Sequence, residues 1–309
     1  MIDYATKANE ARKTALRLIY NAQTSHIGSC FSCADILAVL FEKMDLKKDK
    51  VVLSCGWKAA IFYHFLAEKG FFPKEDLETF CKEVECPDCP CLCTVENSIA
   101  GNRYTNNCIR HSPSSPPCNT CKDTKKVQSK FIGLCEPSVN GINYSGGSMG
   151  HGLPAAVGYA LSKKLKGEEG NVYALMSDGE MAIGTTWESA AIAAHHGLDN
   201  LVVIVDRNGF QAMGETKEIL TIEPLRDKWI YFGWNVCTID GHSFASIESG
   251  IWGTKLGELD EFRKFTESPS IIFANTIKGK GVSFMEGENE WHYRAPNKEH
   301  YEAALKELA

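Results

Sequence analysis

Two strand-like segments of the chain each end in a polar residue that could bind a metal ion. The run "NVYALMS" is followed by Asp178, and the run "NLVVIVDR" is followed by Asn208. Because the carboxyl ends of adjacent parallel strands meet at one edge of a sheet, both side chains are predicted to lie close together. Carboxylate, amide and backbone carbonyl oxygens suit Mg²⁺, which is usually held together with phosphate groups of a ligand. The spacing alone is equally compatible with two ordinary turns, since Asp-Gly and Asn-Gly are common turn pairs.

A second candidate metal site lies in the cysteine-rich segment 81–140. Nine of the thirteen cysteines fall between residues 81 and 135. Two Cys-x2-Cys pairs in this segment have the spacing of tetrahedral structural zinc ligands. These pairs are Cys86 with Cys89 and Cys118 with Cys121, and the alternate ligands are Cys93, Cys108 and His111. An iron–sulfur cluster or unligated redox thiols are the alternatives to zinc. Cys30, Cys33, Cys55 and Cys237 lie in regular elements and are predicted to be small core residues.

Length and composition indicate an ordinary globular protein. The 309 residues include 44% hydrophobic and 23% charged residues, and the formal net charge is −6. This acidic balance argues against nucleic acid or an anionic membrane as the main partner. No apolar run is long enough to span a membrane, and no signal peptide is recognisable. The sequence therefore predicts a cytoplasmic protein, in which clustered thiols favour metal binding over disulfides.

Strand-like and helical segments alternate along most of the chain. Strands are predicted at 51–55, 171–177, 200–206, 234–239 and 270–277. Helices are predicted at 3–25, after Ser32, and at 59–70, 153–165, 187–197, 224–233 and 258–266. Ser32 and Asp35 fit a capping box in front of the second helix. This alternation predicts an α/β fold, a doubly wound and mostly parallel sheet with helices on both faces. Segment 81–140 shows no sustained period and is predicted to be an irregular insert.

Four motifs in the same order resemble the N-terminal half of transketolase, a family that uses thiamine diphosphate. The family's Gly-Asp-Gly and later Asn resemble "SDGEMAIGTTWESA" and "VDRNG", with Ser177 in place of the first glycine. Its histidine element is similar to "SHIGSCFSCADIL", and its glycine-rich loop is similar to "GINYSGGSMGHGLPAAVGYAL". Its C-terminal stretch is similar to "NTIKGKGVSFMEGENEWHYRAPNKEHYEAALKEL". The resemblance implies one diphosphate-binding domain over residues 1–309, with segment 81–140 inserted in it.

The resemblance also implies roles for individual residues. Asp178, Asn208 and the backbone carbonyl of Phe210 would bind Mg²⁺, which would hold the cofactor's diphosphate. Gly179 would let the backbone approach that diphosphate. The thiazolium ring would be lined by Gly147, Ser148 and Met149. Further cofactor-binding and catalytic candidates are His26 and His292, and Glu188 is another catalytic candidate.

The family's glutamate that touches the cofactor's pyrimidine lies in a second domain, and this chain stops at Ala309. The resemblance therefore implies one subunit of a split transketolase, inactive without a pyrimidine-binding partner subunit. A heterotetramer is the expected assembly. The expected reaction transfers a two-carbon ketol unit from a ketose donor to an aldehyde acceptor. Another thiamine diphosphate-dependent C–C lyase or synthase, and a non-catalytic partner-binding relative, are the alternatives.

Three positions depart from the family pattern. Trp57 stands where the family has a histidine that contacts the donor, and an indole has one donor and no acceptor. A Pro-Gly-His-Pro loop, which carries another substrate histidine, is not found in segment 81–140. Ile183 replaces a glutamate that links the two active sites of the family. These changes favour an unusual or modified sugar as substrate.

Overall fold

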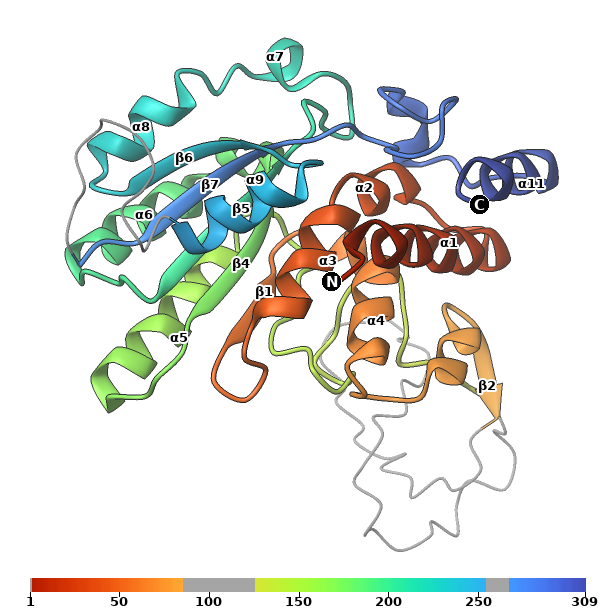
Figure 1. Cartoon of the computed structure of the whole chain (residues 1–309), viewed down its shortest axis with the longest axis horizontal. Helices are drawn as coiled ribbons and strands as arrows, with labels where there is room; N and C mark the ends of the chain where they lie inside the picture. The colour runs from red at the N-terminus through yellow and green to blue at the C-terminus, as the bar shows by residue number, and fades with distance from the viewer. Residues whose placement is uncertain (1, 86–125, 254–266) are drawn as a thin grey trace, which may run out of the picture.

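A five-stranded parallel sheet lies at the centre of the molecule (Figure 1). The computed structural model describes residues 2–85, 126–253 and 267–309. The strands follow the order β1-β4-β5-β7-β6, and every neighbouring pair is parallel. They are β1 (Lys50–Leu53), β4 (Val172–Ser177), β5 (Leu201–Arg207), β6 (Asn235–Asp240) and β7 (Ser270–Asn275). The five predicted strands and the parallel sheet are thus confirmed.

The inner strands β4, β5 and β7 are buried on both faces of the sheet, which explains why they are continuous apolar runs. In β4, Tyr173 and Leu175 belong to the core on one face, whereas Ala174 and Met176 belong to the core on the other. Side chains of a strand alternate between faces, so a single apolar run serves both cores. The prediction of helices on both faces of the sheet is confirmed.

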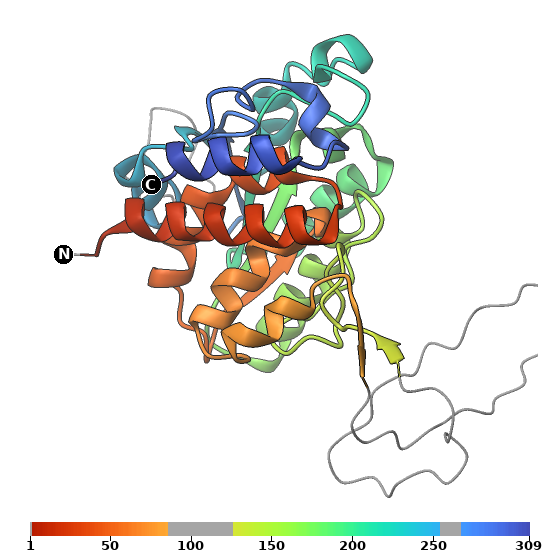
Figure 2. The same ribbon diagram turned by 90° about the vertical axis from the view of Figure 1, so that its right-hand side faces the viewer.

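The first face is covered by helices from both ends of the chain. These are α1 (Tyr4–Ala22), α2 (Ile27–Ser32), α3 (Ala34–Lys43), α4 (Ala59–Glu68), α9 (Phe244–Glu248) and α11 (Lys298–Glu307). Figure 2 shows α1 and α11 side by side. The rings of Tyr20 and Tyr301 stack between these two helices, with centroids 4.3 Å apart. This contact holds the last helix of the chain against the first.

The second face is covered by α5 (Gly152–Lys166), α6 (Gly184–His195) and α8 (Leu225–Tyr231). An aromatic cluster fills the space between α6, α8 and the sheet. Trp229 packs against Trp234 with ring centroids 4.7 Å apart and against Trp187 at 5.3 Å. Trp234 also donates to the carbonyl of Ala190 in α6 at 2.9 Å. The four-residue helix α7 (Thr216–Ile219) lies in the connection between β5 and α8.

The predicted capping box of Ser32 and Asp35 is wrong. Ser32 is the last residue of α2, and α3 begins after Cys33, which makes no side-chain capping bond. Asp35 instead accepts hydrogen bonds from Arg12 at 2.6 Å and from Nδ1 of His242 at 2.7 Å. The side chains of Ser32 and Asp35 are both buried, so tertiary partners replaced the local cap.

The described ends of segment 81–140 are partly regular. They form an antiparallel pair of β2 (Glu83–Glu85) and β3 (Lys126–Gln128). Beyond β3, Phe131, Cys135 and Val139 are buried in the main core. The candidate zinc ligands at 86–121 and the helix predicted at 258–266 lie outside the described residues. Cys30, Cys33, Cys55 and Cys237 are buried, which confirms them as core residues.

Two glycines allow the glycine-rich loop to lie directly on the end of β1. Gly56 begins the short 3-10 helix η1 (Gly56–Lys58), and its N–H donates to the carbonyl of Gly146 at 3.2 Å. A Cβ built on Gly56 would lie 2.4 Å from that carbonyl oxygen, and one on Gly146 would lie 2.6 Å from the carbonyl oxygen of Leu53. No side chain fits at either position, so both glycines are required by backbone approach.

Candidate active site

The loops that follow β4 and β5 are joined at the carboxyl edge of the sheet. Ser177 pairs with Asp206 in the parallel register, so Asp178 and Asn208 leave the sheet next to each other. Asp178 starts the short helix η3 (Asp178–Ala182) and is 1% exposed. Its Oδ1 accepts the N–H of Gly179 at 2.9 Å, and its Oδ2 accepts the N–H of Gly209 at 2.9 Å. The carboxylate of one loop therefore holds the backbone of the other.

Asn208 also stabilises its own turn, because its Oδ1 accepts the N–H of Phe210 at 3.0 Å. The oxygen of Asn208 has a second lone pair, so it can stabilise the turn and still bind a metal ion. The turn and the metal site are therefore compatible roles for Asn208. Burial and the charge of Asp206 raise the pKa of Asp178 to about 6. A buried carboxylate of this kind gains stabilisation from a cation placed beside it.

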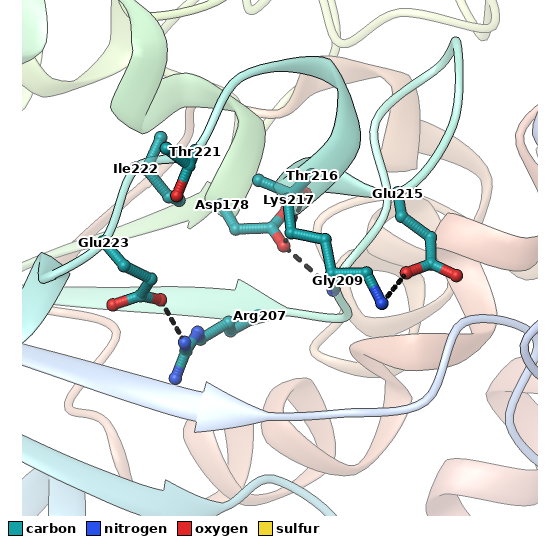
Figure 3. Close-up of a pocket in the computed structure, with 9 residues that line it drawn as sticks. All are labelled: Asp178, Arg207, Gly209, Glu215, Thr216, Lys217, Thr221, Ile222 and Glu223. Carbon is teal, nitrogen blue, oxygen red and sulfur yellow. Dashed lines mark hydrogen bonds and ion pairs between the residues drawn. The ribbon is translucent and has the colours of Figure 1, made fainter.

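Asp178 lines a cavity of about 180 Å³. Figure 3 shows the residues that line it. Its other walls come from the end of β5 and from the segment 215–223. Thr216 donates to Oδ2 of Asp178 at 3.3 Å, and the ion pairs of Arg207 with Glu223 and of Lys217 with Glu215 also line the cavity. The other four charged side chains of the lining are therefore in ion pairs with one another, whereas Asp178 is in none with the described residues.

Gln211 provides a buried donor that has no partner among the described residues. Its Nε2 atom is shielded from solvent and makes no hydrogen bond. The side chain lies against Gly179, where a Cβ would be 3.3 Å from Cγ of Gln211. An unpaired buried donor costs about 1–3 kcal/mol unless a ligand accepts its hydrogen. The oxygen donors of Asp178 and Asn208 suit a hard cation, and the Gln211 donor suits an anionic oxygen, so the residues present fit a magnesium-bound diphosphate.

His26 and His292 come from opposite ends of the chain and meet beside Lys278. The backbone N–H of His26 donates to the backbone carbonyl of His292 at 2.8 Å, and the centres of the two imidazole rings lie 5.0 Å apart. His292 belongs to the short helix η5 (Asn289–His292). Nζ of Lys278 lies 3.1 Å from Nδ1 of His292 and donates to Oδ1 of Asn289 at 2.8 Å. Because an ammonium group can only donate, Nδ1 of His292 is the acceptor and its Nε2 carries the hydrogen.

Both histidines are neutral at neutral pH in this environment. Burial, followed by the charge of Lys278, lowers the pKa of His26 to about 4 and the pKa of His292 to about 3. Burial also lowers the pKa of Lys278 to about 8. Lys278 is 1% exposed and lies 5.3 Å from the ring centre of Phe210, so its cation faces the loop after β5. Sequence reasoning missed Lys278, although it lies inside the quoted motif "NTIKGKG".

Glu180 is a second residue that sequence reasoning missed. Its carboxylate is fully buried and accepts the N–H of Ser177 at 2.8 Å, the N–H of Gly150 at 3.0 Å and the hydroxyl of Ser54. These three donors belong to the end of β4, the glycine-rich loop and the end of β1. Glu180 therefore fixes the glycine-rich loop relative to Asp178. The Ser-x-x-Glu spacing of Ser177 and Glu180 was a readable signal, because it forms a capping box at η3.

The remaining candidates lie at the open side of the site or away from it. Gly147, Ser148 and Met149 are exposed in the loop before α5. Glu188 is exposed on α6, and its side chain makes no hydrogen bond or ion pair with the described residues. Trp57 is half-buried and packs against the first core. The structure therefore brings together Asp178, Asn208 and Gln211, and separately His26, His292 and Lys278, but gives Glu188 no contact with either group.

The described residues contain neither a cluster of His, Cys, Asp and Glu metal ligands nor a membrane-spanning helix. Within residues 2–85, 126–253 and 267–309, no group of three or more His, Cys, Asp or Glu side chains is arranged to bind a metal ion. The same part of the chain contains no helix that is both long and apolar enough to cross a membrane.

The family model and the similar proteins all concern transketolases. The family described as "Transketolase, thiamine diphosphate binding domain" matches residues 117–308. The 6-deoxy-6-sulfo-D-fructose transketolase subunit SqwG of Clostridium sp. is 33% identical, over 99% of this chain and 96% of that protein. An apulose-4-phosphate transketolase subunit from Actinobacillus succinogenes is 31% identical, over 98% of this chain and 94% of that protein.

Single-chain transketolases are longer than this chain. The rat transketolase is 26% identical over 97% of this chain, which spans 41% of the rat protein. The crystal structure of transketolase from Campylobacter jejuni has the same fold, with a TM-score of 0.77, 22% identity and coverage of 100% of this chain and 43% of that one. The chain therefore belongs to the transketolase family and carries its thiamine diphosphate-binding domain.

Proposed function

We propose that this chain is the diphosphate-binding subunit of a two-subunit transketolase-like enzyme. The enzyme transfers a two-carbon ketol unit from a ketose donor to an aldehyde acceptor. The main structural support is the bond between Gly209 and Asp178, which joins the two loops beside the unpaired donor of Gln211. Further support comes from relatives named as transketolase subunits, which match this chain over more than nine-tenths of their own length.

In this proposal Mg²⁺ is held by Asp178, Asn208 and the backbone carbonyl of Phe210. The diphosphate accepts hydrogen bonds from Gln211 and from Lys278. Thiamine diphosphate, when bound, supplies the carbanion chemistry that breaks and forms C–C bonds. The protein supplies positioning and charge: a rigid carboxylate for the metal and buried donors for the anionic oxygens.

His26 and His292 have a different role from the metal ligands. Both are neutral at neutral pH, so each ring has one N–H donor and one acceptor nitrogen. Lys278 fixes the hydrogen of His292 on Nε2, the atom that can donate to a phosphate or a sugar hydroxyl. In His26, Nδ1 is hydrogen-bonded to the hydroxyl of Ser25 at 2.8 Å, which orients the ring. These rings can hold or move a proton at the donor substrate.

A pyrimidine-binding partner subunit completes the site in this proposal. Ile277 and Tyr293 are exposed by 38% and 63% and are the chain neighbours of Lys278 and His292. Met213 is 79% exposed and follows Ala212, whose carbonyl accepts a hydrogen bond from Asn289 at 3.2 Å. Exposed apolar side chains gathered at a site are typical of protein–protein interfaces. We expect the partner to cover them, to supply the glutamate that touches the pyrimidine ring, and to form a heterotetramer with this chain.

The proposed substrates are sugars other than the common ones. The two relatives described above are named for a sulfonated fructose and for apulose 4-phosphate, both of which are unusual sugars. Trp57 supports the same conclusion, since an indole at the donor side cannot accept a hydrogen bond from a hydroxyl. A cytoplasmic location, expected from the sequence, agrees with a role in sugar metabolism.

Zinc in segment 81–140 is a separate proposal that rests on cysteine spacing alone. The purified chain should contain bound zinc, held in one site or in two. Elemental analysis of the parent and of a Cys118→Ser, Cys121→Ser variant would test this. A parent protein without zinc would exclude the site.

The function is tested by isolating the tagged chain with its native partner and adding thiamine diphosphate and Mg²⁺. Ketose donors are then screened with aldehyde acceptors for transfer of the two-carbon unit. We expect turnover by the complex, none by the two separated proteins, and none by an Asp178→Ala complex. Binding of thiamine diphosphate without transfer to any aldehyde, but with release of a product from a keto acid, would favour a lyase or synthase instead.

A further inference from the structure

Directly beneath the candidate site lies a buried ion pair that the proposed function does not use. Lys58, the last residue of η1, pairs with the carboxylate of Asp206 near the end of β5. Their side chains are 1% and 0% exposed. A buried ion pair is often no more stabilising than well-packed apolar residues of similar size, so core packing alone does not explain it.

Asp206 connects four segments of the chain. Its Oδ2 accepts the hydroxyl of Ser32 in α2 at 2.6 Å as well as the ammonium group of Lys58. Its Oδ1 accepts the hydroxyl of Thr276, which follows β7. Both oxygens are therefore used by donors from α2, η1 and the end of β7.

Three of the connected segments continue directly into a residue of the candidate site. The helix α2 begins at Ile27, immediately after His26. Asn208 lies two positions after Asp206, in the loop after β5. Lys278 lies two positions after Thr276, in the segment after β7. A shift of Asp206 would therefore move the metal loop, one histidine and the Lys278 cation together.

The charge of Lys58 also acts on the site. Asp178 and Asp206 are buried carboxylates at the carboxyl ends of the adjacent strands β4 and β5. The ammonium group of Lys58 pairs with one of these two negative charges, and the buried ammonium group of Lys278 lies 5.3 Å from the ring centre of Phe210 in the loop after β5. Lys58 thus offsets the second carboxylate while adding positive potential where an anion would bind.

We propose that the Lys58–Asp206 ion pair is the positioning element of the site: it neutralises Asp206 and fixes α2, β5 and β7 so that the metal–diphosphate residues keep their geometry and charge balance. The proposal rests on the proposed function, because it assigns the pair to the site for Mg²⁺ and thiamine diphosphate. Lys58 and Asp206 are positioning residues and do not contact the cofactor.

The test compares two variants of opposite charge in the native complex, using calorimetric titration with thiamine diphosphate and Mg²⁺. In Lys58→Met the unpaired carboxylate repels the diphosphate, so the dissociation constant of thiamine diphosphate at saturating Mg²⁺ should rise about tenfold or more. In Asp206→Asn the unpaired ammonium repels the cation, so half-saturation by Mg²⁺ at saturating cofactor should require about tenfold more metal. The double variant, which has neither charge, should recover most of the cofactor affinity.

The matched control is Lys163→Met. Lys163 is also buried, on α5, but donates to the carbonyl of Glu169 at 2.8 Å on the other side of the sheet. It should lower the melting temperature without changing either binding constant by more than about twofold. If Lys58→Met does not fold, Asp206→Asn and the double variant still test the proposal. Asparagine has the shape of aspartate, and neither variant contains an unpaired buried carboxylate at position 206.

The outcomes separate the two proposals. A parent complex without magnesium-dependent binding of thiamine diphosphate overturns the proposed function and this inference with it. A parent complex that binds, with Lys58→Met and Asp206→Asn within about twofold of it, overturns only the role of the ion pair. Equal losses of cofactor and metal affinity in both variants, without recovery in the double variant, show a structural role and also overturn it.

Discussion

Nζ of Lys278 lies 3.1 Å from Nδ1 of His292, so a buried ammonium group donates directly to a histidine that must stay neutral. Burial and the charge of Lys278 both lower the pKa of His292, to about 3. In Lys278→Met the charge is lost while burial remains, so the pKa of His292 should rise toward its ordinary value. Nitrogen chemical shifts of the imidazole, followed against pH by NMR, measure this directly.

The control for that experiment is Lys280→Met, because Lys280 is half-exposed and pairs with Glu286 at 3.3 Å. This variant should leave the His292 titration unchanged. An unchanged titration in Lys278→Met would mean that Lys278 does not set the protonation of His292.

Asp178→Asn should abolish metal-dependent cofactor binding. The substitution removes the charge that would bind Mg²⁺, and it places an amide NH₂ near the N–H groups of Gly179 or Gly209. We expect the dissociation constant of thiamine diphosphate to rise about a hundredfold or more, as measured by calorimetry. Asp199→Asn is the matched control, since Asp199 is exposed and lies 4.0 Å from the ammonium nitrogen of Lys164. Retained affinity in Asp178→Asn would exclude Asp178 as a metal ligand.

Glu180→Gln should lower the free energy of unfolding by about 2–4 kcal/mol, because the amide cannot accept all the donors that the carboxylate now accepts. Those donors are the N–H groups of Ser177 and Gly150 and the hydroxyl of Ser54. Urea unfolding followed by tryptophan fluorescence measures the change. The exposed Glu188 provides the control, and Glu188→Gln should change the free energy of unfolding by less than about 0.5 kcal/mol. Equal effects of the two variants would contradict the assignment of Glu180 as a structural tie.

His64 should make the fold less stable in acid. It is buried in α4, with Nδ1 2.9 Å from the hydroxyl of Thr14 and Nε2 3.9 Å from Glu68. Burial lowers its pKa to about 4, against the opposing charge of Glu68. The unfolded chain therefore takes up this proton below about pH 6.5, while the folded chain takes it up only near pH 4.

Stability should consequently fall as the pH decreases from about 6.5 to 4, by at most about 1.4 kcal/mol per pH unit from this residue. The free energy of unfolding, measured with urea at each pH in this range, should change less steeply with pH in His64→Gln than in the parent. His195→Gln is the control, because His195 is exposed at the end of α6. If the free energy of unfolding changes with pH as steeply in His64→Gln as in the parent, other groups cause the acid sensitivity.

Much of the fold was predictable because the inner strands β4, β5 and β7 are apolar runs that are buried on both sides. Val203 and Val205 face one core while Val202 and Ile204 face the other, so the run itself reports a buried parallel strand. The alternation with helices then predicted the sheet. The position of Asp178 beside the loop of Asn208 followed from the same reasoning, because parallel strands end at a common edge.

The interactions that hold the site could not be predicted in the same way. Lys58 and Asp206 are 148 positions apart, and Ser54 and Glu180 are 126 apart. Periodicity tells which face of an element a residue occupies, but not which distant polar group it will meet there. The same limit explains the error at Ser32, because its hydroxyl lies 2.6 Å from the carboxylate of Asp206, which is 174 positions away and which no local pattern predicts.

The contact between Gly56 and Gly146 limits how this site can be altered by evolution or by design. Because the backbones of both residues touch, neither position can accept even a methyl group without separating β1 from the glycine-rich loop. New substrate preferences must therefore arise at side chains beside this contact, and Trp57 is the immediate neighbour of Gly56. Saturation mutagenesis aimed at new sugar acceptors or donors is best confined to such flanking positions, and Gly56 and Gly146 are best left unchanged.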